Sequence, residues 1–410
     1  MHRFYQEQYQ LDAGKQDRYV TGSDAVGLSM GTYDTRNLAI YKYLHRKHHP
    51  KYAIADNFFQ AAFGGSFLNH QWLIAAATPT WPGAPEAQHS ILDSNGMPTN
   101  YPLYKSPVTS GLRDAPLTAA CGAALQGQLC GDYAVNTIQP AYQPYVPNTA
   151  EDRRLPPQTH PTIGDRLSAK KVDWAWYSGG WSNANGAVGK PGWTNGDGST
   201  GACSDPDSLP NATFPYCASK LFQFHHQPLN YFASFAPGTV ERAKHLRDEA
   251  EFVSKTQNSK QKCTLKPVSF VKPVGSENEH PGYASVSTGS NHLVSLLSAI
   301  ENGKCAKDTM VVVTYDEFGG QWDHVSPPGQ GGVKGVHDSS GPGTRIPALV
   351  LAKGLPGGFA VDSTQHDTTS VLSTIEHRFG LKPLTSRDAK VKDLSSAFKA
   401  KVVKPVGARR

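Results

Sequence analysis

The chain has 410 residues, of which 38% are hydrophobic, with 39 glycines and 30 prolines. This composition indicates a loop-rich protein of one large domain or two, and it argues against a compact helical fold. The net charge is +6, but residues 382–410 hold nine Lys or Arg and two Asp, so the remainder is close to neutral. Without a basic stripe on the folded body, nucleic-acid binding is not expected. No apolar run is long enough to span a membrane.

The first regular elements lie before residue 80. An amphipathic helix is predicted to begin at Asp34 or Thr35, and a strand is predicted over 52–59. A Gly-Gly-Ser turn then leads into a helix over 67–77. A strand, a glycine turn, Ser66 and a helix together form the geometry that exposes a nucleophile at a helix N-terminus, where free N–H groups favour an anion.

The middle of the chain, about 78–219, shows little periodicity and is dense in Pro, Gly, Trp and Asn. We predict a long irregular insertion that forms one wall of a site. The second half then alternates helices and apolar strands: a helix that ends at Gly303, strands over 309–315 and 345–352, and a helix that begins at Asp367 and ends at Gly380. This alternation predicts an α/β fold with a mainly parallel sheet covered by helices on both faces. We expect a single domain over 1–390 and a basic tail over 391–410.

The cysteines indicate the redox compartment. The six are Cys121, Cys130, Cys203, Cys217, Cys263 and Cys305. No C-x-x-C motif is present, which argues against a zinc ribbon or a thioredoxin-like motif. Because short loops close most readily, we expect three disulfides in sequence order. The first two of them would lie inside the insertion. Three disulfides indicate a periplasmic or secreted protein, although MHRFYQEQYQ at the start is not a signal peptide. The alternative is six unrelated buried thiols.

The sequence VTYDEFGGQWDHV carries the strongest chemical signal. An apolar run over 310–314 ends at Asp316 and Glu317, and a glycine pair frees the backbone behind them. Two adjacent carboxylates at the end of a buried strand favour a cation, because open α/β sheets bind ligands at their strand ends. The alternative is a solvated turn after a strand.

Several other side chains fit the same chemistry. Ser66, Asn69 and His70 stand at i, i+3 and i+4, so they share one helix face, although Ser66 alone is typical of an N-cap. His226 follows an aromatic run and His280 precedes a proline; an isolated histidine in such a place is usually structural. Together with the paired carboxylates, a serine nucleophile and histidines that protonate a leaving group indicate a phosphoester hydrolase.

The order of GGSFLNH, HHQP, HPGYASVSTG, TMVVVTYDEFGGQWDHVSPP, GTRIPALVLA and HDTTSVLSTIEHRFG resembles one bacterial phosphoesterase family. This family unites non-haemolytic phospholipases C with respiratory-burst-inhibiting acid phosphatases and belongs to the alkaline phosphatase-like superfamily. The resemblance runs from Arg3 to about Leu384. Segments such as ADNFFQAAFGGSFLNH are closer to the acid phosphatase branch.

The resemblance implies a role for each matched residue. Ser66 would be the nucleophile and would also touch one divalent metal ion of unknown identity, with Asp316 and Glu317 as further metal ligands. His280 and one histidine of the HHQP motif, for which we favour His226, would line the phosphate pocket and supply a proton. The other residues implied at the substrate side are Asn69, His324, which orients the loop behind the ligands, and a further pocket histidine, His2.

One part of the family pattern is not found. The family begins with an apolar strand that ends in a Glu-Asn pair, in a context like ENRSFD, and these two residues complete its metal site. This chain has no such block. We therefore expect a chain without its first strand and export signal, through either a start codon placed too late or a degraded copy.

The leading hypothesis is an exported phosphomonoesterase that works through a phosphoserine at a divalent metal. One alternative is a phospholipase C acting on phosphocholine lipids, for which choline would need an aromatic cage. Candidates for that cage are Trp174, Trp176, Trp181 and Trp193. A second alternative is a truncated, inactive remnant or binding protein. A serine hydrolase of the G-x-S-x-G type is less consistent, because the one match, GLSMG at 27–31, does not follow a predicted strand.

Overall fold

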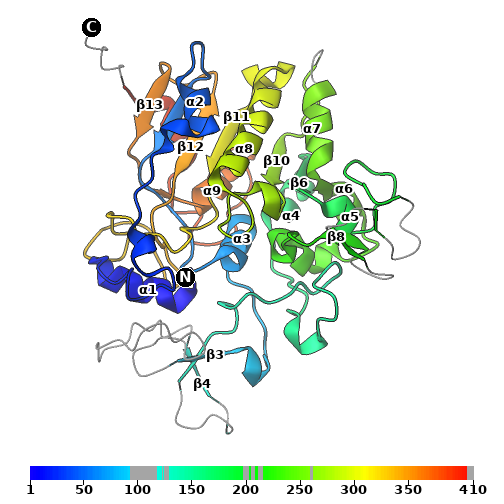
Figure 1. Cartoon of the computed structure of the whole chain (residues 1–410), viewed down its shortest axis with the longest axis vertical. Coiled ribbons are helices and arrows are strands. Elements are labelled where there is room, and N and C mark those ends of the chain that lie inside the picture. Colours follow the sequence, from blue (N-terminus) through cyan, green and yellow to red (C-terminus); the bar gives the residue numbers. More distant parts are fainter. Residues whose placement is uncertain are drawn as a thin grey trace.

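The computed structural model describes residues 1–92, 118–121, 123, 129–196, 203–204, 208–210, 216–258 and 262–403. These residues form a mixed α/β arrangement of several sheets flanked by helices (Figure 1), which confirms the predicted class. Among them, no helix combines the length and apolar character needed to cross a membrane.

The largest sheet has five strands in the order β11 (Met310–Thr314), β12 (Ala348–Ala352), β1 (Tyr52–Ala55), β13 (Phe359–Asp362) and β15 (Lys401–Val402). Only β1 and β13 run parallel; β12 is antiparallel to both β1 and β11, and β15 is antiparallel to β13. The prediction of a mainly parallel sheet is wrong here. The segment 315–347 has no crossover helix, so it returns the chain beside β11 with Thr314 opposite Ala348, which gives an antiparallel pair.

A second sheet has three parallel strands in the order β10 (Val268–Lys272), β6 (Trp174–Ser178) and β9 (Leu246–Asp248). Every residue of the central strand β6 is buried, as expected for a parallel strand that is covered on both faces. This strand lies inside the predicted insertion, together with α4 (Ile163–Ala169) and α5 (Trp181–Ala184). The insertion is therefore regular over this part, because the WAWYS run is apolar on both faces and supplies the core.

The other helices are α1 (Phe4–Leu11), α2 (Ala39–His45), α3 (Ser66–Ala75), α6 (Val240–His245), α7 (Glu249–Asn258), α8 (Val286–Glu301) and α9 (Thr369–Phe379). The other strands are β2 (Phe58–Phe59) with β14 (His366–Asp367), β3 (Ser90–Leu92) with β4 (Thr118–Ala120) and β5 (Leu129–Gly131), and β7 (Ser208–Pro210) with β8 (Cys217–Ser219). The predicted strand over 52–59 thus divides into β1 and β2. Within 391–410, the described part holds β15 and a 3-10 helix, Leu394–Lys399.

Helix α3 joins the two main parts of the core. Phe67 and Ile74 belong to an apolar cluster with Trp174 of the three-stranded sheet, whereas Leu68 packs in a second cluster with Ala348 of the five-stranded sheet. Figure 1 shows α3 at the middle of the molecule, below both sheets in this view. Because α3 is buried on nearly all sides, the position of Ser66 at its first turn is fixed by packing from both sheets.

The three disulfides pair in the predicted order: Cys121 with Cys130, Cys203 with Cys217, and Cys263 with Cys305. All six cysteines are thus bonded, and the alternative of unrelated thiols is excluded. Such bonds stabilise a fold mainly by restricting the unfolded chain.

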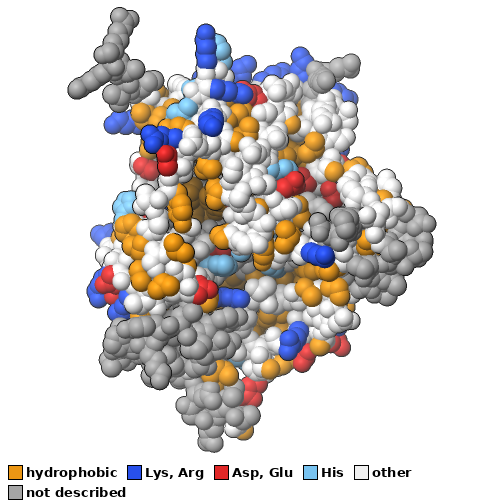
Figure 2. Space-filling model, viewed as in Figure 1, with side chains coloured by type: hydrophobic (Ala, Val, Ile, Leu, Met, Phe, Trp, Pro, Cys, Tyr) orange, Lys and Arg blue, Asp and Glu red, His pale blue; other side chains and the backbone are white. Residues whose placement is uncertain are grey.

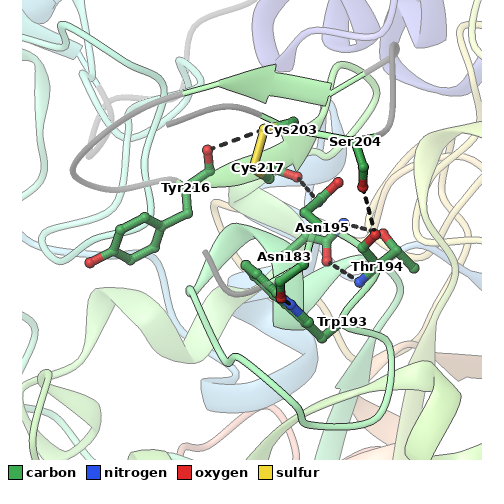
Figure 3. Close-up of a disulfide and its surroundings, with 9 residues drawn as sticks. Asn183, Trp193, Thr194, Asn195, Cys203, Ser204, Tyr216 and Cys217 are labelled. Atoms are coloured by element: carbon green, nitrogen blue, oxygen red, sulfur yellow. Dashed lines mark hydrogen bonds between the residues drawn. A yellow bond between two sulfur atoms is a disulfide. The ribbon is translucent and has the colours of Figure 1, made fainter. Parts of the chain in front are cut away.

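The Cys203–Cys217 bond closes a small hydrogen-bonded corner of the insertion (Figure 3). Asn195 donates from Nδ2 to the carbonyl of Cys217 at 3.3 Å, and Ser204 donates from Oγ to the carbonyl of Thr194 at 3.0 Å. Asn183 of α5 then exchanges two hydrogen bonds with Thr194, of 2.7 and 3.0 Å. These contacts tie the glycine-rich loop after α5 to strand β8.

Candidate active site

Ser66 begins helix α3 after a turn that only glycine can make. Gly64 has a φ of +91°, and a Cβ on Gly65 would lie 2.8 Å from the carbonyl oxygen of His2. The turn therefore brings the backbone of residue 2 against Gly65, the residue before the serine. The Ser66 hydroxyl is buried and donates to Oε1 of Glu317 at 3.4 Å.

The paired carboxylates follow β11, as predicted, and lie in different surroundings. Asp316 faces Lys272, with Oδ1 3.5 Å from Nζ, and His70, with Oδ2 3.5 Å from Nδ1. Glu317 is buried and accepts from the Gly319 amide at 2.6 Å. Burial, followed by the negative charge of Asp316, raises the pKa of Glu317 well above its usual range. Burial opposes ionisation of Asp316 too, but Lys272 and then His70 hold its pKa below the usual range.

Three histidines gather near Asp316. The rings of His70 and His226 stack with centroids 4.7 Å apart, and the ring of His225 lies 4.5 Å from that of His226. Burial is the largest cause that lowers the pKa of each, to about 4 for His70 and about 3 for His225. Figure 2 shows histidine side chains near the middle of this face of the molecule. The three imidazoles are therefore neutral near pH 7 and can accept as well as donate protons.

A second pair of histidines, His2 and His280, lies near Glu317. His2 Nε2 is 3.8 Å from Glu317 Oε1, and the ring of His2 meets the ring of His280 edge to face at 5.7 Å. His280 also stacks on Tyr283 at 4.1 Å. Burial is the first cause that lowers the pKa of His2, to about 4. The site thus holds histidines near both carboxylates.

The loop that carries His280 is held by a separate polar group. His292 of α8 contacts Glu249 of α7 at 2.7 Å through Nε2 and Glu277 at 3.6 Å through Nδ1. Potential ligand atoms of these three residues lie within 4.8 Å of one another. The same imidazole thus contacts both carboxylates, which connects the 275–283 loop to two helices.

The serine turn is held by a buried carboxylate that the sequence did not point to. Glu7 of α1 accepts from the amide and hydroxyl of Thr344, from Gln60 Nε2 and from the Gly64 amide. Gln60 in turn accepts from the amide of Phe318 at 2.8 Å. Asn69 donates to the carbonyls of Ala62, Gly64 and Gly65 at 3.0–3.2 Å. This network fixes the backbone beside both Ser66 and Glu317.

The burial of Glu7 predicts a dependence of stability on pH. Burial raises the pKa of this carboxyl from 4.5 to about 7. The folded chain then keeps a proton that the unfolded chain loses, so the free energy of unfolding should fall as the pH rises from 4.5 to 7, by about 3 kcal/mol from this group. Denaturant titrations at several pH values should show this fall relative to Glu7→Gln, which does not titrate. Parallel pH profiles for the two proteins would contradict it.

The structure brings Ser66, His226, Asp316 and Glu317 together, with His280 reached through His2. Two other predicted residues lie elsewhere. Asn69 binds the backbone of the turn, so it positions the serine. His324 is exposed, and its ring lies 6.0 Å from that of Trp322. Among the described residues, it makes no contact with Ser66, Asp316 or Glu317.

Sequence reasoning missed three participants: Lys272, Glu7 and Gln60. Lys272 ends an apolar strand just as Asp316 follows one, so its place at a strand end was a usable signal. Glu7 and Gln60 gave no such signal, because their partners are distant in sequence.

The donor atoms suit a divalent cation. Asp316 Oδ2 is buried without a hydrogen bond among the described atoms, and two adjacent carboxylates that resist joint ionisation are stabilised by a cation. Asp316 could hold a cation with either of two groups of ligand atoms. The first is the hydroxyl oxygen of Ser66 and a carboxylate oxygen of Glu317. The second is the ring nitrogens of His70 and His226. The atoms of the second set lie within 4.8 Å of one another. Oxygen ligands suit Mg²⁺, Ca²⁺ or Mn²⁺, and nitrogen ligands suit Zn²⁺.

Comparisons with known proteins support this chemistry. The sequence model of the Phosphoesterase family matches residues 1–382. Phospholipase C B of Mycobacterium tuberculosis is 33% identical over 172 residues, which cover 36% of this chain and 31% of that protein. The non-hemolytic phospholipase C of Pseudomonas aeruginosa is 30% identical over 163 residues, 33% of this chain and 23% of that protein. The non-specific phospholipase C6 of Arabidopsis thaliana is 27% identical over 138 residues, 29% of this chain and 26% of that protein. The match thus spans less than a third of each relative.

Proposed function

Because this chain belongs to the phosphoesterase family, as its resemblance predicted, we propose that it hydrolyses phosphate esters through Ser66 at a cation held by Asp316 and Glu317. The observation that carries the proposal is the hydrogen bond from Ser66 Oγ to Glu317, made at the first turn of a buried helix. Free amides of that turn and the helix dipole favour a bound phosphoryl group. We also propose an alkaline phosphatase-like arrangement and, from the three disulfides, an exported protein.

The chain's own residues support a two-step reaction. Ser66 Oγ attacks phosphorus, its proton passes to the ionised form of Glu317, which a cation at Asp316 would favour, and the bond from phosphorus to the leaving oxygen breaks. His226 or His280 donates a proton to that oxygen. Water then attacks the phosphoserine, its proton returns to the histidine, and Glu317 reprotonates Ser66.

A divalent cation would be held by Asp316, with either Ser66 and Glu317 or His70 and His226. When bound, it supplies charge that polarises the phosphoryl oxygens and lowers the pKa of the serine hydroxyl. The turn fixed by Glu7 and Asn69 keeps Ser66 aligned with the incoming phosphorus, and burial of the hydroxyl limits competing water.

The observations bear on two substrate classes. The names of the relatives favour a phospholipid head group, which is a phosphodiester. The burial of the tryptophans considered for a choline cage favours a phosphomonoester instead. Trp174, Trp176 and Trp181 are each no more than 3% exposed and lie in the core, so they do not form an open cage for choline. Lys272 beside Asp316 would also repel a quaternary ammonium.

Turnover of two chromogenic esters tests the function. The chain, supplied in turn with Mg²⁺, Ca²⁺, Mn²⁺ and Zn²⁺, should release p-nitrophenol from p-nitrophenyl phosphate or from p-nitrophenylphosphorylcholine. Acid quenching during turnover should trap a phosphorylated peptide that contains Ser66, identified by mass spectrometry. No release from either ester with any of these cations would refute the proposal.

A further inference from the structure

Lys272 places a positive charge at the edge of the proposed site. It is the last residue of β10, opposite Ser178 at the end of β6, so both side chains lie where parallel strands end. Its side chain is 18% exposed, and Nζ lies 3.5 Å from Asp316 Oδ1. The ammonium is thus next to the carboxylate pair and still open to solvent.

The contact of Lys272 with Asp316 is too long for a full charge-assisted hydrogen bond, which joins atoms 2.7–2.9 Å apart. Lys266, two residues before the same strand, offers a comparison. Its Nζ lies 2.8 Å from both carboxylate oxygens of Asp173, which is a closed ion pair. Among the described residues, the Lys272 ammonium makes no hydrogen bond of normal length. Its three N–H donors are therefore available to a ligand.

The charge of the substrate decides how strongly this ammonium attracts it. A phosphomonoester, whose second pKa is about 6, carries nearly two negative charges at pH 8, whereas a phosphodiester carries one. In a partly buried site the ammonium attracts the second negative charge of the monoester much more strongly than it would in bulk water.

We propose that Lys272 is a specificity-determining residue, which contacts the phosphoryl oxygens of the substrate and sets the preference for doubly charged monoesters over singly charged diesters. This inference rests on the proposed phosphoester hydrolysis at Ser66. It assigns to Lys272 a direct role toward substrate, in place of a purely structural ion pair with Asp316. The distinction is measurable because an effect through Asp316 would change the turnover of both ester classes equally.

The test compares kcat/KM for p-nitrophenyl phosphate and bis(p-nitrophenyl) phosphate in three variants. Lys272→Gln should lower the monoester value about 50-fold and the diester value by less than about fivefold, because only the monoester loses an attraction to its second charge. Lys272→Arg keeps the charge and should retain both values within about fivefold. Lys266→Gln, the matched control, should leave the ratio of the two values unchanged.

Two results would overturn the role of Lys272 while leaving hydrolysis at Ser66 intact. One is an equal loss of kcat/KM for both esters in Lys272→Gln. The other is that the wild-type protein hydrolyses only the diester. If the wild type turns over neither ester, the proposed function fails. Calorimetric titration with inorganic phosphate at pH 8 then still tests the inference. Wild type should bind phosphate at least about tenfold more tightly than Lys272→Gln, and equal affinities would overturn it.

Discussion

Replacing Ser66 with alanine should lower kcat/KM for a phosphoester by about 10³-fold or more, because the covalent route disappears with the hydroxyl. The fold should survive. Gly65, not Ser66, occupies the cap position of α3, and the Ser66 hydroxyl donates its hydrogen bond to Glu317. The melting temperature of the variant should therefore stay close to that of the wild type while p-nitrophenol release and the trapped phosphopeptide both vanish.

Ser285→Ala provides a matched control for this loss. Ser285 caps helix α8 and accepts from the Thr288 amide at 3.0 Å, so its replacement should cost about 1 kcal/mol of stability but leave turnover unchanged. The two serines thus separate a catalytic effect from a capping effect. If Ser66→Ala keeps near-normal turnover, a water molecule rather than this serine attacks phosphorus, and the proposed mechanism is wrong.

The parts of the fold that the sequence could predict are those decided by local patterns. The strand at β11, the helix at α3 and the cysteine pairing depend on apolar runs, glycine turns and short loops, and all three are present. The direction of β12 was not predictable in this way. A buried apolar run such as ALVLA reads the same in a parallel and an antiparallel pair.

The candidate site divides along the same line. Ser66 and the Asp316–Glu317 pair follow regular elements directly, so their chemistry is visible in short motifs. Glu7 and Lys272 act through contacts with residues far away in sequence: Glu7 with Thr344, and Lys272 with Asp316 from a different sheet. Such contacts depend on how the two sheets lie around α3, which no local pattern specifies.

Asp316→Asn should weaken divalent-cation binding on the order of 100-fold or more, measured by calorimetry on the whole chain. Asp316 belongs to both ligand sets, and the amide that replaces it keeps the shape but removes the charge that holds a cation. Asp323→Asn is the matched control: Asp323 pairs with Arg345 at 3.1 Å outside the site, so this change should leave cation affinity intact.

Two further variants decide which atoms hold the cation. Glu317→Gln should weaken binding only if the oxygen set is used, and His226→Gln only if the nitrogen set is used, because each set contains one of these residues but not the other. If Asp316→Asn binds cations as well as the wild type, the cation lies elsewhere. The group of Glu249, Glu277 and His292 is then the place to test. A loss of binding in Glu249→Gln would show that the cation binds beside the His280 loop. Ser66 would then lack the charge that its chemistry needs.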